Sequence, residues 1–109
     1  MIFRLWITVV GLAAAFVASN HAGADDSEAA ALGLELVSTY CADCHAIGVT
    51  GESPFPPAPP FRDLHLRYDV EYLSEALVEG IVTAHPEMPE FEFDPDQAAA
   101  IATYLKSLE

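Results

Sequence analysis

Basic residues are scarce in this sequence, which has four Lys and Arg against seventeen Asp and Glu. Nucleic acids and anionic lipid surfaces attract positively charged proteins, so both are poor partners for so acidic a chain. Strand signals are lacking as well, because no β-branched run alternates with polar residues after residue 24. The sequence therefore predicts an all-α fold.

Cysteine is also rare, since Cys41 and Cys44 are the only two in the chain. Two are too few for the disulfide framework of a small secreted domain, and the short loop between them disfavours a plain disulfide. A thioredoxin-like redox pair would need a preceding strand and a βαβ frame. A zinc site could combine both thiols with two of three histidines. These histidines are His45, His65 and His85.

The first residues have the pattern of a signal peptide. Arg4 precedes an apolar run over 5–18 that is short for a membrane span, and Ala22-Gly23-Ala24 offers the small residues that signal peptidases prefer. We predict a signal peptide at 1–24 and a single domain at 25–109. An uncleaved anchor or a buried first helix are the alternatives. Cleavage would leave three basic and seventeen acidic residues, which give a formal charge of 3 − 17 = −14. We expect the cleaved protein not to insert stably into a membrane.

Helical patterns occur in three segments of the predicted domain. Asp26 or Ser27 can cap a helix over 28–42, and Asp69 can cap another over 70–79. Asp94, followed by Pro95 and three residues later by Gln97, has the pattern of a capping box at the start of a terminal helix. The expected apolar positions of the first helix are Leu32, Leu34, Leu36, Val37 and Tyr40.

Proline-rich segments separate these helices. Residues 48–60 contain five prolines and are predicted to form a loop without regular structure. Pro86 and Pro89 bracket Met88, which places this methionine on a stiff, extended segment.

The segment Cys41-Ala-Asp-Cys44-His45 carries the clearest chemical signal. Two thiols three positions apart on a helical turn share one face, where they can form thioether bonds with the two vinyl groups of a haem. His45 is then placed to ligate the iron. Met88 is the only methionine after residue 24 and is the candidate for the opposite axial position. His85 and His65 are its rivals, because imidazole also binds haem iron.

In these features the chain resembles the class I c-type cytochromes over nearly all of residues 25–109. Gly33 stands where that family commonly has a glycine at the crossing of its first and last helices, and Ile101 to Lys106 is similar to the family's aromatic terminal helix. Met88-Pro89 with Phe91 looks like the distal ligand segment. The resemblance implies a cytochrome c-like fold and one covalent haem c, with His45 and Met88 as the axial ligands. It also implies that the carbonyl of Pro59 accepts a hydrogen bond from the His45 ring.

The function that this resemblance implies is one-electron transfer between redox protein partners, without enzymatic activity. The predicted signal peptide indicates the periplasm, and the acidic charge favours partners with basic patches. A haem sensor or small haem enzyme with a displaceable Met88 is an alternative. A subunit of a larger redox complex is another, and an exposed apolar patch would favour it. The candidates for that patch are Phe55, Phe61, Phe91 and Phe93. For the anionic haem propionates the nearest donors are Arg62, Arg67, Tyr68 and Tyr72, although both arginines could instead pair with Asp63 or Asp69.

Overall fold

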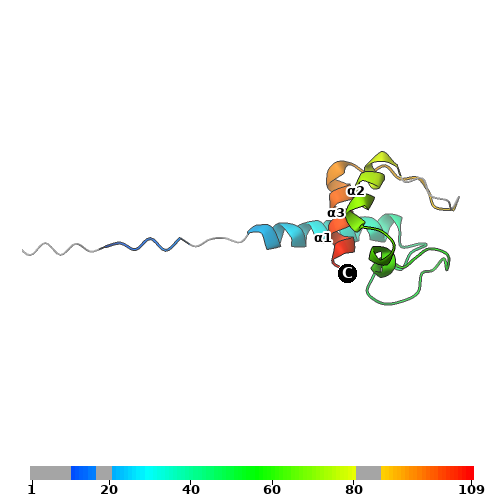
Figure 1. The fold of residues 1–109 in the computed structure, drawn as a ribbon, viewed down its shortest axis with the longest axis horizontal. Helices are drawn as coiled ribbons and strands as arrows, with labels where there is room; N and C mark the ends of the chain where they lie inside the picture. Colours follow the sequence, from blue (N-terminus) through cyan, green and yellow to red (C-terminus); the bar gives the residue numbers. More distant parts are fainter. Residues whose placement is uncertain (1–10, 17–20, 81–86) are drawn as a thin grey trace, which may run out of the picture.

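The computed structural model describes residues 11–16, 21–80 and 87–109, and within these ranges all regular structure is helical. Four helices follow in the order α1 (His21–Tyr40), the 3-10 helix η1 (Phe61–Leu66), α2 (Val70–Glu79) and α3 (Pro95–Lys106). In Figure 1, α3 crosses α1 and α2 lies beside α3. The predicted all-α class is thus confirmed.

The α1 helix differs from the predicted span of 28–42 at both ends. It begins at His21, because no proline interrupts residues 21–27 and the two alanines there favour a helix. It ends at Tyr40, because the Ala42 N–H bonds to the carbonyl of Val37, five positions back, and so leaves the helical pattern. The predicted cleavage position falls inside α1, while most of the apolar run 5–18 lies outside the described residues.

The other two predicted helices are confirmed together with their capping groups. Asp69 accepts a hydrogen bond from the Glu71 N–H at the start of α2, and Gly80, with φ of 98°, follows its last residue. At α3 the Asp94 carboxylate accepts from the Gln97 N–H (2.8 Å) and the Gln97 side chain accepts from the Asp94 N–H (3.2 Å). This is the predicted capping box. The η1 helix was not predicted.

Gly33 lies at the crossing of α1 and α3. A Cβ built at this position would stand 2.1 Å from the Ala100 carbonyl oxygen and 2.7 Å from the Tyr104 Cβ. Both distances are far below ordinary van der Waals contact, so any larger residue would force the helices apart. The expectation that a glycine permits this crossing is confirmed.

The core forms where α1, η1 and α2 pack against α3. On α1 the face toward α3 is Gly33, Leu36 and Val37, whereas Leu32 and Leu34 are more than 40% exposed. The predicted apolar set of this helix was therefore too broad, because α3 crosses only one side of α1. The other large buried side chains are Phe61, Leu64, Val70, Leu77, Phe93, Ile101, Tyr104 and Leu105.

Candidate functional site

The two cysteines lie in the turn that follows α1. Hydrogen bonds to the Cys41 carbonyl from the N–H groups of Cys44 (3.2 Å) and His45 (3.0 Å) wind residues 41–45 into a compact turn. Both thiols are half-buried and neither is in a disulfide. Burial raises the pKa of the Cys41 thiol to about 11, so it stays protonated at neutral pH. An activated redox pair needs a thiol of lowered pKa instead.

His45 is oriented by a hydrogen bond to the proline-rich loop. Its ring Nδ1 lies 2.8 Å from the Pro59 carbonyl oxygen, which has no proton of its own, so Nδ1 donates. The neutral ring then keeps its acceptor lone pair on Nε2, the atom that would bind a metal. The predicted contact with Pro59 is therefore confirmed. Phe61 packs against the same ring, with 4.8 Å between the centroids.

The loop that carries Pro59 is held by bonds to the cysteine turn. The Phe55 N–H donates to the Cys44 carbonyl (3.1 Å) and the Phe61 N–H donates to the Ala46 carbonyl (2.9 Å). The Ser53 hydroxyl accepts from the Ala46 N–H (3.0 Å). These bonds fix the Pro59 carbonyl relative to His45. Sequence reasoning missed Ser53, because a serine before a proline in a loop carries no local sign of its partner.

The terminal helix is joined to the same region by Tyr104. Its hydroxyl donates to the Ile47 carbonyl, two residues beyond His45. Burial raises the pKa of Tyr104, so the hydroxyl remains a neutral donor over the physiological range. The turn that carries both cysteines and His45 is thus fastened to α3 as well as to α1.

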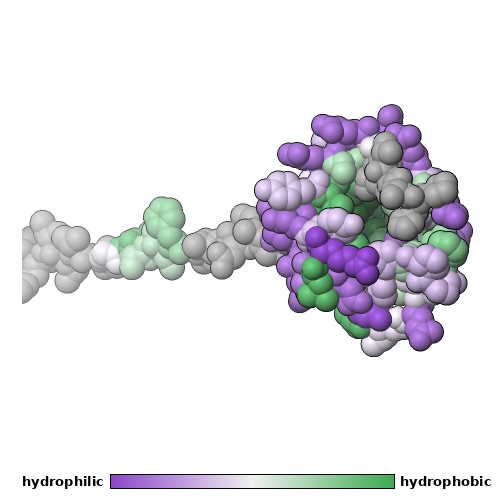
Figure 2. Space-filling model, turned by 45° about the vertical axis from the view of Figure 1, so that its right-hand side comes forward, coloured by the Kyte–Doolittle hydropathy of each residue, from purple (hydrophilic) through white to green (hydrophobic). Residues whose placement is uncertain are grey.

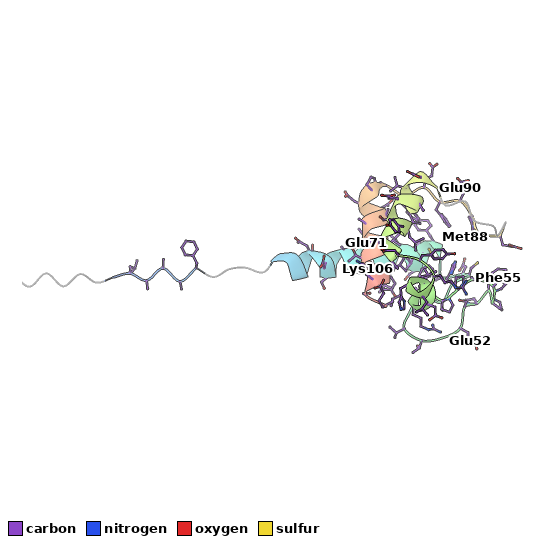
Figure 3. The ribbon with its side chains drawn as sticks, viewed as in Figure 1. Glu52, Phe55, Glu71, Met88, Glu90 and Lys106 are labelled. Atoms are coloured by element: carbon purple, nitrogen blue, oxygen red, sulfur yellow. The ribbon has the colours of Figure 1, made fainter. Side chains whose placement is uncertain are left out.

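Met88 lies in residues 87–94, which lead into α3 and which we call the strap; it is outside any helix, as predicted, and is half-buried. Figure 3 shows Met88 on this strap at the same end of the molecule as Phe55 of the proline-rich loop. Figure 2 shows that hydrophobic residues gather in a hollow on the face turned toward the viewer, whereas most of the surrounding surface is hydrophilic. His85 lies outside the described residues.

The two arginines differ in their surroundings. Among the described residues the ion pair is Lys106 with Glu71 (2.6 Å), so neither Arg62 nor Arg67 forms the surface pair considered as an alternative. Arg67 is exposed. The Nη1 of Arg62 is buried without a hydrogen-bond partner in the described part of the chain. A buried cationic donor of this kind fits an anionic group such as a carboxylate.

The residues present therefore fit a covalently bound haem. The two thiols are free, the His45 ring is set with Nε2 available, and a buried arginine nitrogen lacks an anion. Zinc is the competing occupant, but in the described ranges no three His, Cys, Asp or Glu side chains come together as a metal site.

The four phenylalanines whose exposure would favour a subunit of a larger complex are all at least half-buried. Phe61 and Phe93 are buried, and Phe55 and Phe91 are half-buried. In the described part of the chain, no helix combines the length and the apolar composition that a membrane crossing requires.

Comparison with known proteins gives two consistent matches. The sequence profile of the family described as cytochrome c matches residues 30–109. A cytochrome c-552 from Bradyrhizobium diazoefficiens is 32% identical over 97 residues, which cover 89% of this chain and 88% of the relative. No solved structure matches the chain significantly.

Proposed function

Since this chain belongs to the cytochrome c family, a family of covalent haem c proteins that carry electrons, we propose that Cys41 and Cys44 hold its haem and that His45 and Met88 are the axial ligands. When bound, the haem supplies an iron that alternates between Fe(II) and Fe(III). The observation that carries the proposal is the 2.8 Å contact between His45 Nδ1 and the Pro59 carbonyl, because it leaves Nε2 as the ligand atom.

Each residue has a distinct part in this function. Cys41 and Cys44 anchor the cofactor to the turn after α1, and Pro59 raises the basicity of His45 through the hydrogen bond to its ring. Met88 offers a thioether, which favours Fe(II) and so raises the reduction potential. With both axial positions filled by side chains, the protein needs no substrate site, which agrees with an electron carrier and not an enzyme.

Export to the periplasm and a basic redox partner belong to the same proposal. Residues 1–24 would act as the signal peptide, with cleavage after Ala24. The resulting chain has a formal charge of 3 − 17 = −14, which attracts partners that carry basic patches around their own docking sites.

Replacement of both cysteines by alanine tests the attachment. We expect Cys41→Ala with Cys44→Ala to give a largely unfolded apoprotein, because a domain of this size has a modest core without its cofactor. The wild-type protein should keep its haem through acid–acetone extraction and give a thioether-type pyridine-haem spectrum. Haem that remains bound to the double variant through the extraction would refute covalent attachment at these residues.

Separate replacement of Met88 and His85 tests the distal ligand. Met88→Ala should remove the weak far-red iron–sulfur band of the ferric protein, allow rapid CO binding in the reduced protein, and lower the reduction potential. His85→Ala is the matched control and should leave all three unchanged. The opposite pattern would assign the distal position to His85 and make the ligation bis-histidine.

A further inference from the structure

Three aromatic rings join the end of α1 to the strap that carries Met88. The ring centroid of Tyr40 lies 6.0 Å from that of Phe91 and 5.6 Å from that of Phe93, with edge-on interplanar angles of 61° and 72°. Phe91 and Phe93 stack at 5.8 Å. Edge-on and offset pairs at these separations are attractive beyond the area they bury. We call these three residues the aromatic clamp.

The clamp lies between the two parts of the proposed haem site. Tyr40 is the last residue of α1 and directly precedes Cys41, while Phe91 follows Met88 by three positions. A contact between the rings therefore connects the attachment turn with the distal ligand segment, which are almost fifty residues apart in the chain.

Two other contacts hold the strap near the end of α2. The Phe93 N–H donates to the Leu77 carbonyl (2.8 Å), and the Phe93 ring is buried in the core. The Glu90 side chain lies over Gly80, where an added Cβ would be 2.7 Å from its Oε1. Phe91 is half-buried and packs against the edge of the core, and the Tyr40 ring adds a further restraint on it three residues from Met88.

From this geometry we propose that Tyr40 is a positioning residue for Met88. Through its contacts with Phe91 and Phe93, the Tyr40 ring holds the strap against the end of α1, so that the Met88 thioether stays on the iron. The inference depends on the proposed ligation by Met88. Tyr40 itself would touch neither the iron nor the sulfur. Because its side chain is 50% exposed, Tyr40 adds little to the core, and its role should be visible in ligand exchange more than in global stability.

Imidazole is a suitable probe, because it can bind the iron only in molecules whose Met88 has left. The apparent affinity of such a ligand is its intrinsic affinity multiplied by the population of the open state. Loss of the two ring pairs of Tyr40 should raise that population, and hence the apparent imidazole affinity of the ferric protein, about tenfold. A tenfold change corresponds to about 1.4 kcal/mol, within the range expected for two aromatic pairs.

The experiment is an imidazole titration of the ferric holoprotein, followed by absorption. Tyr40→Ala should bind imidazole about tenfold more tightly than wild type, whereas Tyr40→Phe keeps the ring and should stay within about twofold. Leu34→Ala is the matched control, since it shortens a comparably exposed apolar side chain (42% exposed) on the same helix away from the clamp. It should leave the affinity unchanged.

Two results would overturn the inference. One is an unchanged imidazole affinity in Tyr40→Ala, and the other is an equal increase in Leu34→Ala, which would indicate general destabilisation. If Tyr40→Ala does not mature, Phe91→Leu tests the same contact from the strap, and an unchanged affinity there is equally decisive. Failure of the parent proposal is recognised separately, because a wild-type protein without the far-red iron–sulfur band would refute ligation by Met88 before any clamp variant is compared.

Discussion

Replacement of Gly33 by alanine is a direct test of the packing that holds the site together. The crossing of α1 and α3 brings Ala100 so close that the new Cβ would be 2.1 Å from its carbonyl oxygen. Ordinary contact begins at about 3.4 Å, so the backbones must separate by about 1.3 Å. The obstacle is backbone, so a rotamer change cannot relieve it.

The cost follows from the side chains around the crossing. A gap of about 0.5–1 Å removes a quarter to a half of the dispersion energy of the atoms facing it, and overpacking of a core costs about 1–3 kcal/mol or more. Val37 and Ile101, both almost fully buried, belong to this interface. Because the obstacle is backbone, the cost lies at the upper end of this range, about 3 kcal/mol. Alanine regains about 1 kcal/mol over glycine in helix propensity, which leaves a net loss of about 2 kcal/mol.

Urea unfolding of the holoprotein, followed by far-UV circular dichroism, measures this loss. Gly33→Ala should lower the midpoint at an unchanged slope, and its melting temperature should fall by about 8–16 °C. Ala31→Gly, at an exposed position of the same helix, isolates the propensity effect and should cost about 1 kcal/mol. A Gly33→Ala protein as stable as wild type would refute the close crossing.

Three further outcomes are expected. Asp94→Ala should lower the free energy of unfolding by about 1 kcal/mol, because the Gln97 N–H loses its capping partner, while Asp94→Ser should retain most of it in the same urea assay. Tyr104→Phe should cost about 1 kcal/mol near neutral pH through the lost bond to the Ile47 carbonyl. Because folding raises the pKa of Tyr104, the tyrosine of the unfolded chain ionises first as the pH rises past 10, and the wild type loses stability. The difference in unfolding free energy between wild type and Tyr104→Phe should therefore shrink at high pH. A difference that grows would contradict the assigned bond. Electron exchange with a basic partner should slow as salt rises, since screening limits attraction to about 8 Å at physiological ionic strength, and a stopped-flow rate that stays flat would reject electrostatic steering.

The sequence by itself determined the parts of this protein that depend on neighbouring residues. Cys41, Cys44 and His45 stand together, so their spacing alone suffices to predict covalent haem attachment. The capping residues of α2 and α3 act within one helical turn, and both helix starts were therefore predicted correctly. The contacts at Gly33 and Pro59 were anticipated from the family resemblance, since nothing local to either residue names its partner.

Only the tertiary structure decided the contacts between distant segments. Tyr40 had been assigned to the general apolar face of its helix, and its pairing with Phe91 and Phe93 depends on how the strap returns across the end of α1. Ser53 and the η1 helix were missed for a similar reason. Apolar periodicity indicates that a side chain is covered but does not identify the side chain that covers it, because hydrophobic attraction is non-directional and many partners can satisfy it.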